Sequence, residues 1–440
     1  MVDSRDKTPS AQETFMQMAK AAGLRGRLFY SIGLLILLRL GVAIPIPGID
    51  RVSFARDIRN SPIIGFLDTF SGGGISALGL FALGILPYIN ASIIIQLLTA
   101  AVPFLENLQK NEGEAGRRKI SQITRYVALG WSILQSAGIA LWVQRYAVNP
   151  GIVFTVQTML ALVAGSMFVM WMSELITERG IGNGASLFIF VSIVSVLPRS
   201  LGQTLELAQS GDGQIVGRVA ILLLVFLIMI VAIVFVQEGT RRIPIISAKR
   251  QVGKRLYREQ KSYLPLRLNQ GGVMPIIFAS SVLILPASLA QFGQGEGEVS
   301  GFSQILAQVA NALRPNSIPY VIVYLIFILF FSYFYASLVV NPVDMSQNLK
   351  KMGATIPGIR PGKTTSEYLE KVLNRLTLLG ALFLGFVAVI PTAVESATNV
   401  TTFQGLGATS LLILVGVAID TAKQIQTYVI SQRYEGMIKQ

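Results

Sequence analysis

Long apolar stretches recur along this chain, and their length limits the folds it can adopt. A helix needs about twenty apolar residues to cross about 30 Å of hydrocarbon, and ten stretches of the 440-residue sequence approach that length. The pattern therefore predicts an all-α polytopic membrane protein with ten transmembrane helices. The predicted spans are 28–46, 77–102, 123–143, 152–176, 185–201, 215–235, 272–289, 318–340, 373–394 and 409–430.

The composition excludes several kinds of chemistry. Hydrophobic residues make up 52% of the chain, and it contains neither Cys nor His. Disulfides, thiolate nucleophiles, imidazole bases and the usual ligands of zinc, copper and haem are therefore missing. We expect a protein without a metal, without a cofactor and without a catalytic site.

Positive charge is concentrated in three of the predicted loops, and the formal net charge is +14. The loop 237–271 carries nine Lys or Arg residues, and the loops 341–371 and 104–119 are also basic. The positive-inside rule places these loops and both termini in the cytoplasm. Topology alone would explain such loops, but nine cations in one of them also suit an acidic partner: ribosomal RNA, an acidic protein or anionic lipid.

Two glycine-containing motifs carry little functional signal. GIRPGKTT, at 358–365, lacks the first glycine of a phosphate-binding loop and follows no predicted strand. GIGNG, at 180–184, fits a short turn between two spans better than a dinucleotide site. The acidic residues at Glu174, Glu178, Asp344, Glu395 and Asp420 all lie near span ends, which disfavours a proton-coupled transporter.

The stretch 61–98 begins as an apolar helix, breaks, and begins again. Ser61 and Pro62 are typical of a helix start, and the glycines 72–74 are typical of a stop. The short segment between them cannot span a bilayer, so at membrane depth it must be buried in protein or line a wet cavity. The alternative is a short amphipathic helix on the outer surface.

The second part of that stretch, LGILPYINASIIIQLL, combines apolar and polar residues on one predicted helix. Ile85, Ile89 and Ile93 recur every four residues, and Asn90, Ser92 and Gln96 lie among them. Polar groups are costly against lipid, so part of this helix should face protein or water. The isoleucines fit plain packing, or a hydrophobic constriction if they face an aqueous funnel.

These residues resemble the SecY family, the channel subunits of the bacterial-type protein translocon. The resemblance extends from IPIPGID at 44–50 through the last span. It includes LGILPYINASIIIQLL, RGIGNGAS, RRIPIISAKRQ, YLPLRLNQGGVMPIIFASS, NPVDMSQNLKKMGATIPGIRPGK and NRLTLLGALFL. The first twenty or so residues and the segment 291–315 carry no such match.

The resemblance implies two inverted five-helix halves, 28–201 and 215–430, around a central hourglass pore. A cytoplasmic segment 1–27, a linker 202–214 and a cytoplasmic tail 431–440 would complete the chain. The implied pore ring is Ile85, Ile89, Ile189, Ile277 and Ile413. The implied plug, within the re-entrant segment 61–71, is Pro62, Ile63, Ile64, Gly65, Phe66, Leu67, Asp68, Thr69 and Phe70. The implied lateral gate includes Asn90, Gln96, Asn183 and Ser281.

The resemblance also implies a function and partners. Unfolded secretory polypeptides would cross through the pore, and apolar segments such as signal sequences would leave sideways into the lipid bilayer. The motor ATPase SecA and the ribosome, through its RNA, would dock on Arg241, Arg242, Lys249, Lys254, Arg255 and Arg360. SecE-like and SecG-like small membrane subunits would complete a complex in the bacterial plasma membrane, or alternatively in a thylakoid membrane. The main rival is a secondary transporter of a small solute, and a weaker rival is an intramembrane protease.

Overall fold

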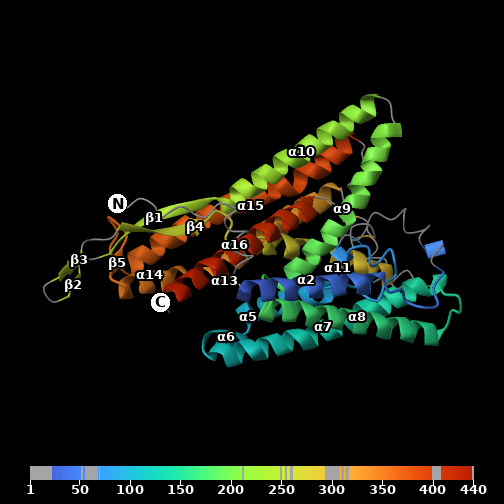
Figure 1. Cartoon of the computed structure of the whole chain (residues 1–440), viewed down its shortest axis with the longest axis horizontal. Helices are drawn as coiled ribbons and strands as arrows, with labels where there is room; N and C mark the ends of the chain where they lie inside the picture. The colour runs from blue at the N-terminus through green and yellow to red at the C-terminus, as the bar shows by residue number, and fades with distance from the viewer. Residues whose placement is uncertain are drawn as a thin grey trace.

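The protein is a bundle of long helices with a small sheet at one end (Figure 1). The computed structural model describes residues 22–50, 53–54, 68, 70–210, 213–247, 250–252, 255–257, 261–292, 308, 312, 317–398 and 408–438. Its helices are α2 (Ala22–Ala43), α5 (Leu86–Ala101), α6 (Pro103–Lys110), α7 (Gly113–Val143), η1 (Gln144–Tyr146), α8 (Ile152–Arg179), α9 (Gly184–Ser210), α10 (Gly213–Glu238), α11 (Met274–Phe292), α13 (Ile318–Val339), α14 (Pro342–Lys351), α15 (Lys363–Thr398) and α16 (Ala408–Ile438).

The predicted spans coincide with helices, but the count of ten membrane crossings stays a prediction. Seven helices of the described chain are long and apolar enough to cross a bilayer, or eight if α5 and α6, bent by 101°, form one span. The apolar part of α11 is shorter, Met274–Leu283. The remaining helix, α16, carries Asp420 and Lys423 beyond its apolar core, and it continues to Ile438 as the sequence predicts.

The helices sort into two groups that meet along a seam (Figure 1). In the first group α7 packs between α5 and α8, and α8 also contacts α2 and α9. In the second group α15 contacts α10, α13 and α16, and α13 contacts α11. Across the seam, α11 packs against α5 and α7, and α16 packs against α9 and α2. This arrangement fits the two expected halves, whose inverted relationship remains a prediction.

The start of the second span is wrong in the sequence prediction. Helix α5 begins at Leu86 rather than at residue 77, with Pro87 in its first turn, and residues 72–85 form turns. Leu78 has a φ of 42°, which a helix does not permit. The Leu80 amide donates to the Ile44 carbonyl at 2.7 Å, so this segment satisfies its backbone against the chain after α2.

The predicted linker 202–214 is also largely helical. Helix α9 continues through Pro198 to Ser210, and α10 begins at Gly213. The cluster Gly-Asp-Gly at 211–213 follows the helix, and residues 211–212 are outside the described part of the chain; the single Gly202 does not end the helix. Residues 203–209 are mostly good helix formers, with Leu205, Glu206, Leu207 and Ala208 in succession, which explains why the helix does not end at the predicted boundary.

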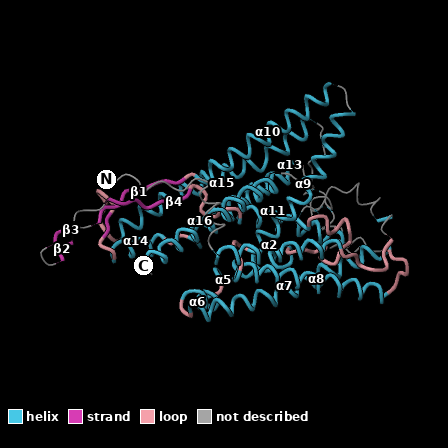
Figure 2. The backbone as a smooth tube through the Cα atoms, viewed as in Figure 1, coloured by secondary structure: helices cyan, strands magenta, loops and turns pink. Residues whose placement is uncertain are grey.

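The two most basic predicted loops meet in one antiparallel sheet of strand order β4-β1-β5 (Figure 2). Its strands are β1 (Thr240–Ser247), β4 (Lys261–Arg267) and β5 (Ala354–Thr355). Ile243 pairs with Leu264, and Ile246 pairs with Thr355. A separate pair, β2 (Arg250–Val252) and β3 (Arg255–Tyr257), lies between β1 and β4 in the chain. The sheet adds strands that the all-α prediction did not contain.

One hydrophobic cluster joins both groups of helices. It draws buried side chains from α2, α5, α8, α9, α10, α11, α13, α15 and α16, and it includes Ile89, Ile189 and Ile277. A smaller cluster beneath the sheet packs Ile243 and Ile245 of β1 against Leu369 and Leu373 of α15. The main core therefore crosses the seam, where the candidate site lies.

Candidate functional site

The five isoleucines of the expected pore ring are all buried in the main hydrophobic cluster. Four of them lie on helices, and the fifth caps one: Ile85 is the N-cap of α5, Ile89 lies on α5, Ile189 on α9, Ile277 on α11 and Ile413 on α16. Each is at most 5% exposed. The fold thus brings together residues that are separated by more than 300 positions in the sequence, in a cluster that makes only non-directional contacts.

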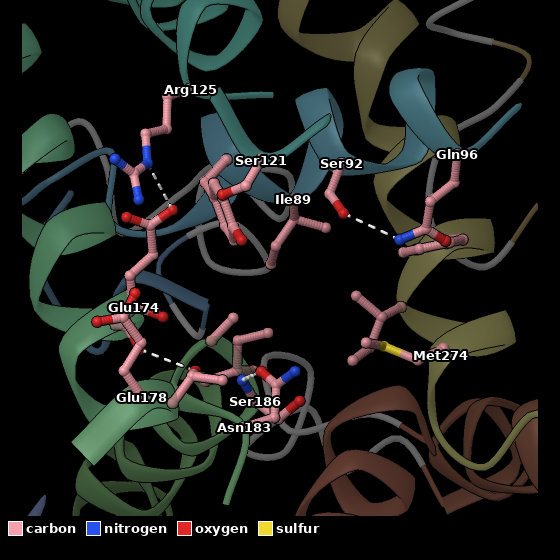
Figure 3. Close-up of a pocket in the computed structure, with 17 residues that line it drawn as sticks. Ile89, Ser92, Gln96, Ser121, Arg125, Glu174, Glu178, Asn183, Ser186 and Met274 are labelled. Carbon is pink, nitrogen blue, oxygen red and sulfur yellow. Dashed lines mark hydrogen bonds and ion pairs between the residues drawn. The ribbon is translucent and has the colours of Figure 1, made fainter. Parts of the chain in front are cut away.

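A cavity of about 350 Å³ lies between α5, α7, α8, α9 and α11, beside three of these isoleucines. Ile89, Ile189 and Ile277 line it, and so do the predicted gate residues Gln96 and Asn183. Figure 3 shows side chains from both sides of the seam facing this space. The full lining is Tyr88, Ile89, Ser92, Gln96, Ser121, Arg125, Ser173, Glu174, Thr177, Glu178, Asn183, Ala185, Ser186, Ile189, Met274, Ile277 and Phe278.

The first-half wall of the cavity carries charge. The Arg125 Nε of α7 lies 3.0 Å from the Glu174 Oε1 of α8 (Figure 3). The Glu174 side chain is only 14% exposed, so the guanidinium supplies a partner that a half-buried carboxylate needs. Glu178, one helical turn further along α8, lines the same space.

The turn from α8 to α9 explains the GIGNG motif. Gly182 has a φ of 87°, and the Gly184 amide donates to the Thr177 Oγ1 at 2.9 Å. A Cβ at Gly184 would lie 1.9 Å from the Ser173 carbonyl oxygen, so only glycine permits this approach of α9 to α8. The Asn183 Oδ1 accepts from the Ser186 amide at 3.1 Å, which is the contact of a helix N-cap.

Tyr335, Gln96 and Ser92 form a chain of hydrogen bonds across the seam, which we call the polar clasp. The Tyr335 hydroxyl of α13 donates to the Gln96 Oε1 at 3.0 Å, and the Gln96 Nε2 donates to the Ser92 Oγ at 3.0 Å. The Tyr335 ring also packs edge-on against Phe278 of α11, with ring centroids 5.2 Å apart. The clasp therefore links α5 to α13, with an α11 side chain held against the same tyrosine.

The other two predicted gate residues do not line the cavity, although both lie on helices of the seam. Asn90 on α5 is 6% exposed, and Ser281 on α11 is 3% exposed. Their helices pack against each other. Of the four predicted gate residues, Gln96 and Asn183 line the cavity and Asn90 and Ser281 do not, and their role as a gate stays a prediction.

Several residues of the site were missed by sequence reasoning. Arg125, Ser173 and Tyr335 received no role, and Glu174 and Glu178 were noted only as residues near a span end. The spacing of the two glutamates, one helical turn apart at the end of an apolar stretch, is a signal that could have found them. The pairing with Arg125 joins positions 49 apart in the chain and has no local signature.

The expected plug lies mostly outside the described residues, which include only Asp68 and Phe70 of its members; Pro62, Ile63, Ile64, Gly65, Phe66, Leu67 and Thr69 are among those not described. Phe70 is buried in the main cluster. The Asp68 Oδ1 accepts from the Ser76 amide at 2.8 Å, and the Gly72 carbonyl accepts from the Arg39 guanidinium. Gly72 and Gly73 have φ values of 67° and 88°, so the chain turns at the predicted stop.

The described members of the expected docking set lie on strands or in a turn at the sheet end of the molecule. Arg241 and Arg242 are exposed on β1, and Arg242 lies over the Tyr263 ring of β4, 4.9 Å from its centroid. Arg360 is exposed in the turn between β5 and α15, where its carbonyl accepts from the Thr365 hydroxyl at 2.9 Å. Arg255 belongs to β3, and Lys249 and Lys254 are outside the described residues.

Within the described ranges, no group of three or more acidic side chains is arranged to hold a metal ion. The cavity contains hydroxyls, amides, one guanidinium and two carboxylates beside an apolar floor. Such a lining can bind flexible segments of mixed polarity.

Comparisons with known proteins agree with this architecture. The family model named SecY matches residues 79–422. The protein translocase subunit SecY of Synechocystis sp. is 71% identical over 441 residues, with 100% of both chains covered. A solved SecY translocation channel with a plug domain superposes with a TM-score of 0.66 at 16% identity, covering 91% of this chain and 92% of that one.

Sec61 from a canine ribosome–channel complex superposes with a TM-score of 0.59 at 16% identity, covering 91% of both chains. At 16% identity, the two solved structures show only that the fold is the same. Family membership is shown by the family model and by the Synechocystis relative. The chain therefore belongs to the SecY family of protein translocase subunits.

Proposed function

We propose that this chain is the protein-conducting channel subunit of a translocase, through which unfolded secretory polypeptides cross the membrane. The observation that carries the proposal is the cavity at the seam. Its lining includes buried isoleucines from both halves, Ile89 and Ile189 on one side and Ile277 on the other. A space that opens onto an apolar constriction is what a passing chain needs.

The pore ring would act by dewetting. Isoleucines form no directional bonds, so they can yield to any side chain that passes and close again when the chain has left. We assign this role to Ile85, Ile89, Ile189, Ile277 and Ile413, and the plug to residues 62–70. The solved SecY channel at a TM-score of 0.66 is described as having a plug domain that maintains a membrane seal, which supports the plug assignment.

Sideways release into lipid would occur between α5 and α11. Asn90 and Gln96 on α5, Ser281 on α11 and Asn183 beside α9 would form the gate. A sufficiently apolar segment would leave through the seam because its transfer into hydrocarbon is favourable, while a polar segment would continue through the pore. The hydrogen bond between Tyr335 and Gln96 would have to break during this step.

A secondary transporter is the less favoured function. Kinship with protein translocase subunits over the full chain supports the channel, and two of the three charged residues in the described cavity lining, Arg125 and Glu174, pair with each other. A serine protease would need a histidine or lysine base beside its serine, and an aspartyl protease would need paired aspartates; the described cavity lining contains no histidine, lysine or aspartate.

The orientation follows from the basic loops. We place the sheet end and both termini in the cytoplasm of the bacterial plasma membrane, with a thylakoid membrane as the alternative. The relative Sec61 is described in a complex with a ribosome, and the exposed cations of β1 and the β5–α15 turn suit an RNA or an acidic protein surface. SecA, SecE-like and SecG-like subunits are proposed on the family resemblance.

Crosslinking of an arrested substrate tests the channel. A photoreactive amino acid at Ile189 should react with a polypeptide stalled in transit through the reconstituted complex. The same probe at Ile228, which is 57% exposed on α10, should not react with it. A stalled chain that reacts at neither position, or equally at both, would place its path elsewhere.

A charge reversal tests the docking assignment separately. Arg360→Glu should slow ATPase-driven export of a reporter, because the exposed turn would then repel an acidic partner surface. The control is Arg118→Glu on α7, whose side chain is 85% exposed and lies outside the sheet. Export at the normal rate in the Arg360 variant would remove this turn from the docking surface.

A further inference from the structure

We infer that Asp420 and Lys423 of α16 are positioning residues, which tie both ends of the hairpin formed by β1 and β4 to the helix that carries Ile413. A partner that displaces the hairpin would then move a residue of the expected pore ring. The inference rests on the proposed function and adds to it a route from the docking surface to the pore. Neither Asp420 nor Lys423 lines the seam cavity.

Two ion pairs join α16 to the ends of the hairpin. The Lys423 Nζ lies 2.9 Å from the Glu238 Oε1, and Glu238 is the last residue of α10, directly before the hairpin. The Arg267 Nη1, at the last residue of β4, lies 3.8 Å from the Asp420 Oδ1. Glu238 and Lys423 also lie close enough to Asp420 to act on it electrostatically. The four side chains therefore form one charge network.

The order of the charges in this network specifies one register. Asp420 and Lys423 are three residues apart, so they are neighbours on one face of α16. Each of them meets an opposite charge on the hairpin side. A shift of α16 by one turn would bring Lys423 toward Arg267 or Asp420 toward Glu238, and like charges repel. The network therefore favours a single position of the hairpin along α16.

Close packing between the ion pairs and the ring supports the same junction. A Cβ at Gly416 would lie 2.7 Å from the Val273 Cγ2, and a Cβ at Gly272 would lie 3.6 Å from the Asp420 Oδ2. Helix α16 is therefore seated against the chain that leads from β4 into α11. Ile413 is fully buried two helical turns before Asp420, about 10 Å along the helix axis. Because a helix is stiff over two turns, a movement at Asp420 reaches the ring.

Both ion pairs are partly exposed, which separates their effect on position from their effect on stability. The Arg267 and Asp420 side chains are 50% and 42% exposed, and those of Lys423 and Glu238 are 29% and 51% exposed. Ion pairs of this kind contribute little to the free energy of unfolding. A variant can therefore lose the coupling between hairpin and helix while it keeps the fold.

The test exchanges the two charges of α16 in the complete reconstituted complex. Asp420→Lys with Lys423→Asp keeps the net charge but places like charges together at both ends of the hairpin. An environment-sensitive dye at Leu411→Cys, a half-buried position next to the ring in a chain without natural cysteine, reports on α16. Docking of the SecA motor should change the dye emission in the complex with native charges. The change should be about fivefold smaller in the exchange variant, as for the loss of two exposed ion pairs.

Two further variants show whether the pairing of charges is responsible. Adding Glu238→Arg and Arg267→Glu to the exchange restores opposite charges at both ends, so the dye response should return. Glu114→Gln with Arg118→Gln is the matched control, because it removes an exposed ion pair on α7, and it should leave the response unchanged. The exchange variant should bind SecA with unchanged affinity, since its two substitutions lie outside the proposed docking residues.

The outcomes separate this inference from the proposed function. A dye that does not respond with native charges, a full response in the exchange variant, or no recovery in the four-residue variant would each overturn the inference. So would loss of SecA binding in the exchange variant, which would make these residues part of the docking surface. In all these cases a complex that still translocates a reporter retains the proposed function. A wild-type complex that translocates no polypeptide would overturn both.

Discussion

The two walls of the seam cavity face the same space but differ in chemistry. The first-half wall, from α5, α7, α8 and the start of α9, carries serines, amides, Arg125 and two glutamates. The second-half wall, from α11, carries Met274, Ile277 and Phe278. One wall can form directional bonds and the other cannot. A seam of this kind can hold a segment of mixed polarity without recognising its sequence.

The strongest way to break this comparison is to prevent the walls from separating. Asn90→Cys together with Ser281→Cys should, after oxidation, abolish membrane insertion of an apolar reporter, because both positions lie on the packed pair α5 and α11. The chain contains no natural cysteine, so the pair reacts alone. Each single variant and the reduced double variant should insert normally. Full insertion with the bridge formed would show that the walls need not part.

The next largest effect concerns the buried isoleucines of the expected pore ring. Ile277→Ser combined with Ile413→Ser should raise resting ion conductance across the bilayer, because hydroxyls stabilise water where isoleucine excludes it. Both residues are at most 2% exposed. Ile228→Ser, on the exposed face of α10, is the matched control. Unchanged conductance in the double variant would move the constriction to other residues.

A smaller effect is expected from the clasp that joins the walls. Tyr335→Phe removes the hydroxyl that donates to Gln96 while keeping the ring against Phe278. The closed seam should lose about 1 kcal/mol, so that reporters of lower hydrophobicity insert about fivefold more often. Tyr333→Phe, whose hydroxyl contacts the Asn374 carbonyl instead, controls for loss of a phenol on α13. An equal response in both variants would argue against the clasp.

The smallest effect should come from the ion pair within the polar wall. A double-mutant cycle of Arg125→Gln and Glu174→Gln should give a coupling of about 0.5 kcal/mol, measured as a change in thermal unfolding of the complex. The pair is partly exposed, which limits its strength. If the two single effects add up to the effect of the double variant, the coupling free energy is zero and the ion pair does not stabilise the protein.

The sequence predicted the apolar parts of the molecule far better than the polar site. Apolar periodicity and length identify the helices, and they place α8 and α13 within a few residues. The start of α5 was missed because residues 77–85 are as apolar as a span yet satisfy their backbone against the chain after α2. Hydropathy does not reveal whether a backbone group bonds within its own helix or to another part of the chain.

The isoleucines were located through family resemblance, since the spacing of Ile85 and Ile89 alone fits ordinary packing as well. The charged wall could not be predicted, because Arg125 meets Glu174 only after α7 and α8 have packed. Tyr335 is a further case: it reaches Gln96 across 239 positions of sequence. Contacts of that separation follow from the tertiary fold and leave no local pattern.

The β1–β4 hairpin is joined to the seam by very little chain. It continues from α10 through Gly239, and it leads into α11 through residues 268–273. The Leu268 amide donates to the Gly239 carbonyl at 2.9 Å, and the Asn269 Nδ2 donates to the Gly272 carbonyl at 2.8 Å, so neither connection is slack. A displacement of the hairpin should therefore move α11, the helix that supplies the apolar wall of the cavity, because short, hydrogen-bonded connections leave little room to absorb it.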